Sequence, residues 1–141
     1  WFVSSRLANF ELLDGLPIET LGNYGGRVQS FDFVRKLKSL RRLWIKTNPK
    51  LESIDFIEEL PNLERIELYF LSKVARFPKC DHLKKLKLIF AYECNRLSDI
   101  SELRKVSGVK ISVSGKAIKD RSYQTGDFSL AEALNVSGRL L

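Results

Sequence analysis

The 141-residue chain has a length typical of one domain and carries a clear excess of positive charge. Its 24 lysine and arginine residues outnumber its 17 acidic residues, which gives a net charge of +7. A solvated surface explains most basic runs, and the alternative is an electrostatic footprint for an acidic partner. No stretch approaches 18 consecutive apolar residues, so we expect no membrane-spanning helix.

The first expected unit lies near the N-terminus and is irregular. Its positions match a clearer unit downstream at an offset of 33 and are filled by Leu7, Phe10, Leu12, Gly15, Ile18 and Leu21. This match predicts a strand centred near Phe10. It also makes the first unit longer than those that follow, and we expect the extra residues to include a glycine-rich loop over residues 22–26.

From residue 28 onward, apolar residues recur with a constant period of 23 residues. Val28, for example, is followed at that spacing by Leu51, Val74 and Leu97. Five such columns stand three residues apart and begin at Val28, Phe31, Val34, Leu37 and Leu40. An apolar residue at every third place, repeated at a fixed period, is typical of a solenoid whose stacked units share one core.

The clearest unit runs from Leu37 to Asn48 and reads LxxLxLxxN from Leu40 onward. We expect Leu40, Leu43 and Ile45 to point inward from a short strand and its approach. Asn48 closes the turn, where its amide can hydrogen-bond backbone groups that the bend leaves unpaired. The next apolar positions are spaced by three residues, which suits a tight 3₁₀ segment with one buried edge.

The later units keep this skeleton with departures. The unit from Leu60 onward matches it but has Leu71 at the turn position. The third full unit has a thinner core, formed by Leu86, Ile89, Ala91 and Cys94. It allows an alternative register in which Leu88 points inward. The last unit begins at Val106 and loses the period by Val113.

The chain changes character after Gly115. Residues 116–126 are polar and charged, and Ser129 to Glu132 reads as a capping box that opens a short helix. We therefore predict a repeat region of about five units over residues 1–115 and a C-terminal capping segment over residues 116–141. A solenoid needs such a terminal element to cover the end of its core.

The LxxLxLxxN skeleton resembles the leucine-rich-repeat family, and the short period is most similar to its bacterial, internalin-like type. The resemblance covers roughly residues 7–113. It implies an α/β solenoid with a curved parallel β-sheet on the concave side and 3₁₀ or short helical turns on the convex side. It also implies a module that holds a protein partner on its concave face.

The sequence contains no pattern typical of an enzyme. It lacks a GxSxG nucleophile elbow, a Walker loop and a dinucleotide fingerprint. Its single histidine, His82, has only Cys80 as a neighbouring metal-binding residue type, so we expect no metal and no cofactor. We therefore expect a protein that is not an enzyme and has no catalytic residues.

Cys80 and Cys94 fall on positions that core or turn residues fill in the other units. We expect two reduced, buried thiols, and the alternative is a disulfide between them. Two core cysteines without a wider framework do not suggest a secreted scaffold, so a cytoplasmic protein fits better.

Strand alternation predicts the binding face. If Leu43 and Ile45 point inward, the residues between and beside them point onto the concave sheet face. In the first unit these positions are Asn9, Glu11 and Leu13. The predicted partner-binding residues are Arg42, Trp44, Lys46, Arg65, Glu67, Tyr69, Phe70, Phe90 and Tyr92. Contiguous exposed rings beside arginines are typical of binding hot spots. The alternative is that some rings lie under a terminal segment.

Three functions fit such a surface. The leading hypothesis is a non-catalytic protein–protein interaction module with a protein partner, for which an acidic protein is one option. A more specific version is an immunity protein that neutralises a bacterial toxin. The alternative of another class is nucleic-acid binding, which the charge and the rings permit but the acidic Glu11, Glu67 and Glu93 weaken. The oligomeric state is left open.

Overall fold

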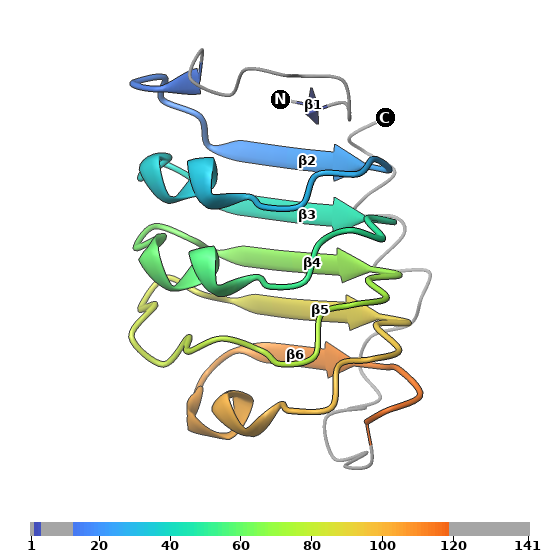
Figure 1. Ribbon diagram of the computed structural model, residues 1–141. Coiled ribbons are helices and arrows are strands. Elements are labelled where there is room, and N and C mark those ends of the chain that lie inside the picture. The colour runs from blue at the N-terminus through green and yellow to red at the C-terminus, as the bar shows by residue number, and fades with distance from the viewer. Residues whose placement is uncertain (1, 4–12, 119–141) are drawn as a thin grey trace.

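The computed structural model describes residues 2–3 and 13–118 of the chain. They form one six-stranded sheet whose strands lie side by side in chain order (Figure 1). The strands are β1 (Phe2–Val3), β2 (Thr20–Tyr24), β3 (Arg42–Lys46), β4 (Arg65–Tyr69), β5 (Leu88–Tyr92) and β6 (Lys110–Val113). Every neighbouring pair is parallel, so each connection returns the chain to the start of the next strand.

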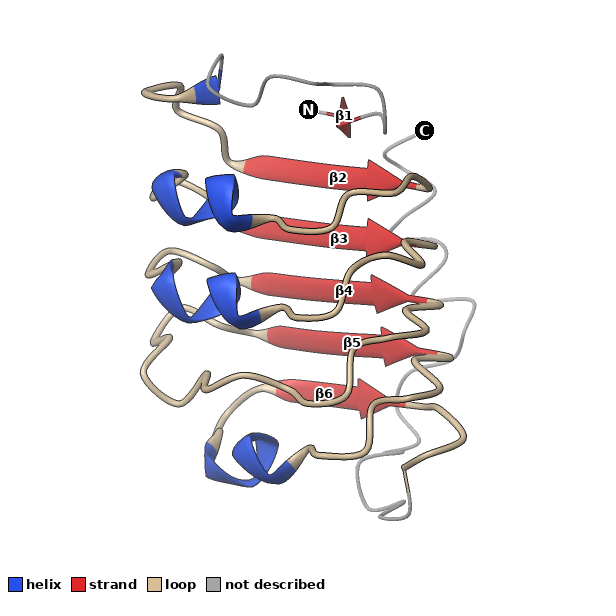
Figure 2. Cartoon of the chain, in the orientation of Figure 1, coloured by secondary structure: helices blue, strands red, loops and turns tan. Residues whose placement is uncertain are grey.

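Short 3₁₀ helices fill three of these connections and stack in one column beside the sheet (Figure 2). They are η2 (Asp32–Lys36), η3 (Asp55–Glu59) and η4 (Ser101–Lys105). A parallel sheet joined by 3₁₀ turns is compatible with a repeat, solenoid-like α/β fold, and this coarser part of the predicted fold class is confirmed. None of the described helices is long and apolar enough to span a membrane.

One hydrophobic core runs between the sheet and the 3₁₀ helices. Leu43, Ile66 and Ile89 occupy equivalent positions in β3, β4 and β5, and all are at most 1% exposed. The predicted columns also line this core: Leu51 and Leu63 are fully buried. Burying one such side chain contributes about 1.5–3 kcal/mol, so the repeated column is the main stabilising feature of the fold.

The turn after β3 follows the sequence-based expectation for Asn48. The Asn48 side chain is fully buried, and its Oδ1 accepts a hydrogen bond from the backbone N–H of Lys50 at 3.2 Å. A buried amide oxygen that binds the bending backbone holds the chain in its turn.

The structure corrects the alignment of the first unit. β2 pairs with β3 so that Leu21 lies opposite Leu43 and Asn23 lies opposite Ile45. The offset is therefore 22 residues and not 33, and the prediction was wrong. Its cause is the inward position filled by Asn23, where the other units have an apolar residue, because this substitution hides the strand from a hydrophobic pattern.

The predicted glycine loop is also shorter than expected. Gly22 lies within β2, and Gly25 and Gly26 follow the strand with φ angles of 71° and 106°. Leu13, which we predicted to point outward from a strand, is instead 5% exposed and lies outside the described strands. The strand near residue 10, the outward Asn9 and Glu11, and the helix after residue 128 lie outside the described residues.

The third unit adopts the first of the two registers. Ile89 and Ala91 are buried in the core, and Leu88, Phe90 and Tyr92 alternate with them. The alternative register with Leu88 pointing inward is therefore wrong.

Candidate functional site: the outer face of the sheet

The strand residues that alternate with core residues form a second surface, which we call the outer face. It consists of Arg42, Trp44, Lys46, Arg65, Glu67, Tyr69, Leu88, Phe90 and Tyr92. These residues lie in matching rows across β3, β4 and β5, and Phe70 directly follows β4. The structure thus brings all of the predicted partner-binding residues to one side of the sheet.

The Tyr69 and Phe90 rings on β4 and β5 are buried, contrary to the prediction, and Tyr92 is partly buried. Tyr69 and Phe90 are 5% and 4% exposed, and their ring centroids lie 5.4 Å apart. The Phe90 and Tyr92 rings stack with centroids 6.3 Å apart. Adjacent strands are only about 4.8 Å apart, so large rings on neighbouring strands cover one another. Alternation gives the direction of a side chain but not how far its neighbours cover it.

A carboxylate lies beside these rings. Tyr69 Oη donates a hydrogen bond to Glu67 Oε2 at 2.9 Å, and Arg65 Nη2 lies 3.3 Å from Glu67 Oε1. Glu67 is only 9% exposed. The hydroxyl and the guanidinium compensate the buried charge, so this part of the outer face is a small polar and aromatic cluster that stabilises the sheet.

The part of the outer face on β2 and β3 is more open. Trp44 is half-buried because its indole lies over Gly22, where an added Cβ would collide with the ring. Lys46 places Nζ 5.2 Å from the centroid of the Tyr24 ring, a cation–π contact. Tyr24 itself is 61% exposed, and Arg42 is exposed.

The residue that follows each of three strands has a left-handed backbone. Thr47, Phe70 and Glu93 have φ angles of 55°, 55° and 52°, and Gly25 fills the same place after β2. The left-handed region costs a residue with a side chain about 1–2 kcal/mol relative to glycine. The amide of Phe70 donates to the Tyr92 carbonyl at 2.9 Å, which holds the chain in this conformation.

Phe70 is the notable member of this row. Glycine satisfies the same backbone requirement after β2, yet here the chain places a phenylalanine that is 45% exposed. Its ring meets the edge of Tyr92 at 5.5 Å and 89°. Strained conformations with an exposed large side chain are concentrated at functional sites, so Phe70 is the strongest single candidate for a contact residue.

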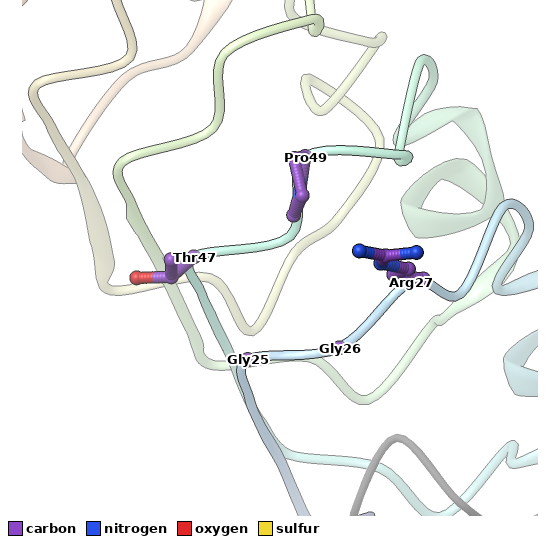
Figure 3. A pocket seen from close by; sticks show the side chains of 5 residues that line it. All are labelled: Gly25, Gly26, Arg27, Thr47 and Pro49. Carbon is purple, nitrogen blue, oxygen red and sulfur yellow. The ribbon is translucent and has the colours of Figure 1, made fainter.

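A pocket of about 450 Å³ opens where β2 and β3 end. Gly25, Gly26 and Arg27 form one wall, and Thr47 and Pro49 lie opposite (Figure 3). None of the described residues that line it is acidic. Sequence reasoning missed this pocket, although two adjacent glycines followed by an arginine were a signal that the backbone there adopts positive φ angles and leaves space.

Three cations on β3 and in the loop after β2 lack acidic partners among the described residues. Within the described part of the chain, Arg27, Arg42 and Lys46 form no ion pair. Lys46 has only its contact with Tyr24. Arg27 and Lys46 therefore project a positive potential from the ends of β2 and β3, whereas Arg42 lies at the start of β3.

Several cations on the opposite surface are paired with acids. We call the surface formed by η2, η3, η4 and the adjoining connections the helical side. There Arg35 bonds to Glu59, and Arg76 Nη2 lies 2.7 Å from Asp55 Oδ2. Each pair joins one unit to the next.

A second row of paired charges crosses the edge where the strands begin. Arg41 Nη2 lies 2.7 Å from Glu64 Oε1, and Lys87 Nζ lies 3.2 Å from Glu64 Oε2. The hydrogen bonds from Arg41 and Lys87 hold the pKa of Glu64 below its ordinary value. Here too the positive charge is compensated by this protein's own acids.

The sulfur and imidazole groups show no reactive arrangement. Cys80 and Cys94 are free and buried, and burial raises the pKa of their thiols to about 12 and about 11. They are therefore protonated at neutral pH and poor nucleophiles. His82 is exposed with a ring nitrogen 2.7 Å from the Glu58 carbonyl oxygen. The described residues contain no cluster of three or more potential metal ligands.

Comparison with known proteins found no relative: neither a family model nor a curated protein matches the chain. The properties of the outer face therefore follow from its own residues. These residues combine an exposed phenylalanine and tyrosine with unpaired cations and an open pocket.

Proposed function

We propose that the protein is a leucine-rich-repeat solenoid that acts as a non-catalytic protein-interaction module. Its binding surface is the outer face of the sheet, which is the concave face of such a solenoid, together with Tyr24 and Phe70 at the strand ends. The observation that carries the proposal is Phe70, an exposed ring in a left-handed conformation that glycine adopts at lower cost.

Three features support the repeat class. The period of 23 residues coincides with one strand and one return segment, as the registry of β3, β4 and β5 requires. The inward residues of the LxxLxLxxN skeleton are buried, including Leu40, Leu43 and Ile45. Asn48 binds the backbone of its own turn.

The exposed residues suit a protein partner better than a small molecule. Phe70 and Tyr24 project from neighbouring parts of one surface, and Tyr92 supports Phe70 edge-on. Aromatic side chains at the centre of an interface contribute a large share of binding energy because they bury a large area at a low entropic cost. The cations beside them can steer an approaching acidic surface.

The test is capture of partners from native lysate with matched baits. The outer-face bait carries Arg42→Ala and Phe70→Ala, and the control bait carries Lys79→Ala and Lys84→Ala on the helical side. We expect quantitative mass spectrometry to find proteins that the wild type and the control retain and the outer-face variant loses. Retention by the outer-face variant together with loss by the control would place the binding surface on the helical side.

The same capture separates protein from nucleic acid. Nuclease treatment and a salt series should leave the recovered proteins in place, because an aromatic interface depends weakly on salt. Recovery that requires nucleic acid and falls steeply with salt would contradict the proposal, since counterion release dominates phosphate binding.

A further inference from the structure

We infer that the pocket at the ends of β2 and β3 is an anion subsite that receives a carboxylate from an acidic segment of the partner. The inference rests on the proposed function, because it specifies the chemistry of the partner at one end of the same surface. It follows from the juxtaposition of Arg27, Lys46 and a pocket of about 450 Å³ without an acidic lining residue.

Arg27 and Lys46 supply positive charge at the pocket. Arg27 lines the pocket and is exposed, and no described residue pairs with its guanidinium. Lys46 ends β3 directly before Thr47, another lining residue. Several cations of the helical side, such as Arg35 and Arg76, are neutralised by acids of the same chain. Arg27 and Lys46 form no ion pair with a described residue and are available to a ligand. A guanidinium binds a carboxylate through charge-assisted hydrogen bonds, often two at once.

The second step is the shape of the site. Gly25 has a φ of 71°, and a side chain added there would meet nothing within 4 Å. Space at this position therefore belongs to the pocket and not to packing within the protein. The pocket thus combines the exposed guanidinium of Arg27 with glycine backbone that a ligand can approach closely.

The third step selects a protein carboxylate over a nucleic-acid phosphate. Single-stranded nucleic acid needs free ring faces on which bases stack. Near this pocket, Lys46 occupies a face of Tyr24, and the Trp44 indole lies over Gly22. The exposed remainder of Tyr24 still offers apolar contact to the side chains of an acidic peptide.

The experiment uses the whole 141-residue chain labelled with ¹⁵N and three probes. The probes are a ten-residue peptide of alternating glutamate and glycine, its glutamine counterpart, and a ten-nucleotide thymidine strand. We expect the glutamate peptide to shift the amide signals of Gly25, Gly26 and Thr47, and the glutamine peptide to leave them unchanged. The thymidine strand should bind these residues more weakly than the glutamate peptide.

Two charge-matched variants control for the net charge of the protein. Arg27→Glu and Lys79→Glu change the net charge equally, but Lys79 lies beside η3 on the helical side, where its amide binds Glu58. We expect Arg27→Glu to weaken peptide binding about tenfold, through the loss of local attraction, and Lys79→Glu to change it less than about twofold.

Equal losses in the two variants, equal binding of the glutamine peptide, or tighter binding of the thymidine strand at these amides would each overturn the anion subsite for an acidic partner. None of these results affects the capture experiment, because its substitutions Arg42→Ala and Phe70→Ala lie outside the residues that line the pocket. Failure of the subsite and failure of the proposed function are therefore distinguishable.

Discussion

Positive charge is compensated to different extents on the helical side and on the outer face of the sheet. On the helical side, Arg35 and Arg76 each bond to an acid of a neighbouring unit. On the outer face, Arg42 and Lys46 have no such partner among the described residues. Exposed ion pairs stabilise a fold only slightly, but they cancel the local charge. On the helical side Arg35 and Arg76 link neighbouring units, whereas on the outer face Arg42 and Lys46 form no ion pair with a described residue.

Aromatic residues divide along the outer face in a similar way. Tyr69 and Phe90 are buried against each other, while Tyr24 and Phe70 project from the strand ends. Tyr69 and Phe90 are packed like core residues, whereas Tyr24 and Phe70 are exposed and can contact a partner. Substitutions in the buried and in the exposed group should therefore affect stability differently.

Leu63→Ala should destabilise the protein most, by about 2–5 kcal/mol, because it opens a cavity in a fully buried column. Chemical denaturation measures the loss in the free energy of unfolding. A loss below about 1 kcal/mol would show that the repeat column is not the main core of the fold.

Tyr69→Ala should cost about 2–4 kcal/mol, since the ring is 5% exposed and packs on Phe90. The loss follows from burial, whereas strand alternation alone predicts an exposed Tyr69 ring. Tyr69→Phe is the matched variant: it keeps the ring and removes the hydrogen bond to Glu67, at a cost of about 1 kcal/mol. Equal stability of wild type and Tyr69→Ala in denaturation would assign Tyr69 to the contact surface.

Gly22→Ala should cost about 1–3 kcal/mol, because the new methyl group occupies the place of the Trp44 indole. The same change in a Trp44→Ala background should cost much less. A double-mutant cycle measures this coupling. Additive losses in the cycle would mean that the indole does not lie over Gly22 in solution.

Phe70→Gly should be about 1 kcal/mol more stable than Phe70→Ala, since glycine adopts a φ of 55° without strain. Thermal unfolding compares the two variants. Both should lose partner binding equally, because both lack the ring. A glycine variant less stable than the alanine variant would contradict the left-handed conformation.

Glu64→Gln should have the smallest effect on the free energy of unfolding, and this effect should depend on pH. Arg41 and Lys87 lower the pKa of the folded carboxyl below its ordinary value of 4.5. Glu64 therefore stabilises the fold above that value, and this contribution is lost as the pH falls through the folded-state pKa. Denaturation at pH 7 should show the wild type as the more stable protein, and the difference should shrink toward pH 3. A constant difference would exclude ionic linkage at Glu64.

The sequence was sufficient to predict β3, β4 and β5 and their core. Leu43, Ile66 and Ile89 repeat at a fixed spacing, and burial makes such a pattern hard to break without loss of stability. The pattern failed at β2, where Asn23 is fully buried although it is polar. A buried amide does not contribute to a hydrophobic pattern, so the sequence predicts a loop where the structure has β2.

For the candidate site, the sequence predicted the direction of the side chains but not their exposure. Alternation placed Trp44, Tyr69 and Phe90 on one face, but their exposure depends on contacts between neighbouring strands that one strand's sequence does not contain. The left-handed backbone of Phe70 has no sequence signal, because glycine or asparagine normally marks that conformation. The pocket beside Gly25 likewise depends on the register of β2 against β3.

Site-specific photo-crosslinking tests most directly whether the outer face is the binding surface. A photoreactive phenylalanine analogue replaces Phe70 in one protein and His82, an exposed residue of the helical side, in another. After irradiation with the captured partner, we expect a covalent adduct from position 70 and none from position 82. An adduct from position 82 alone would contradict this expectation.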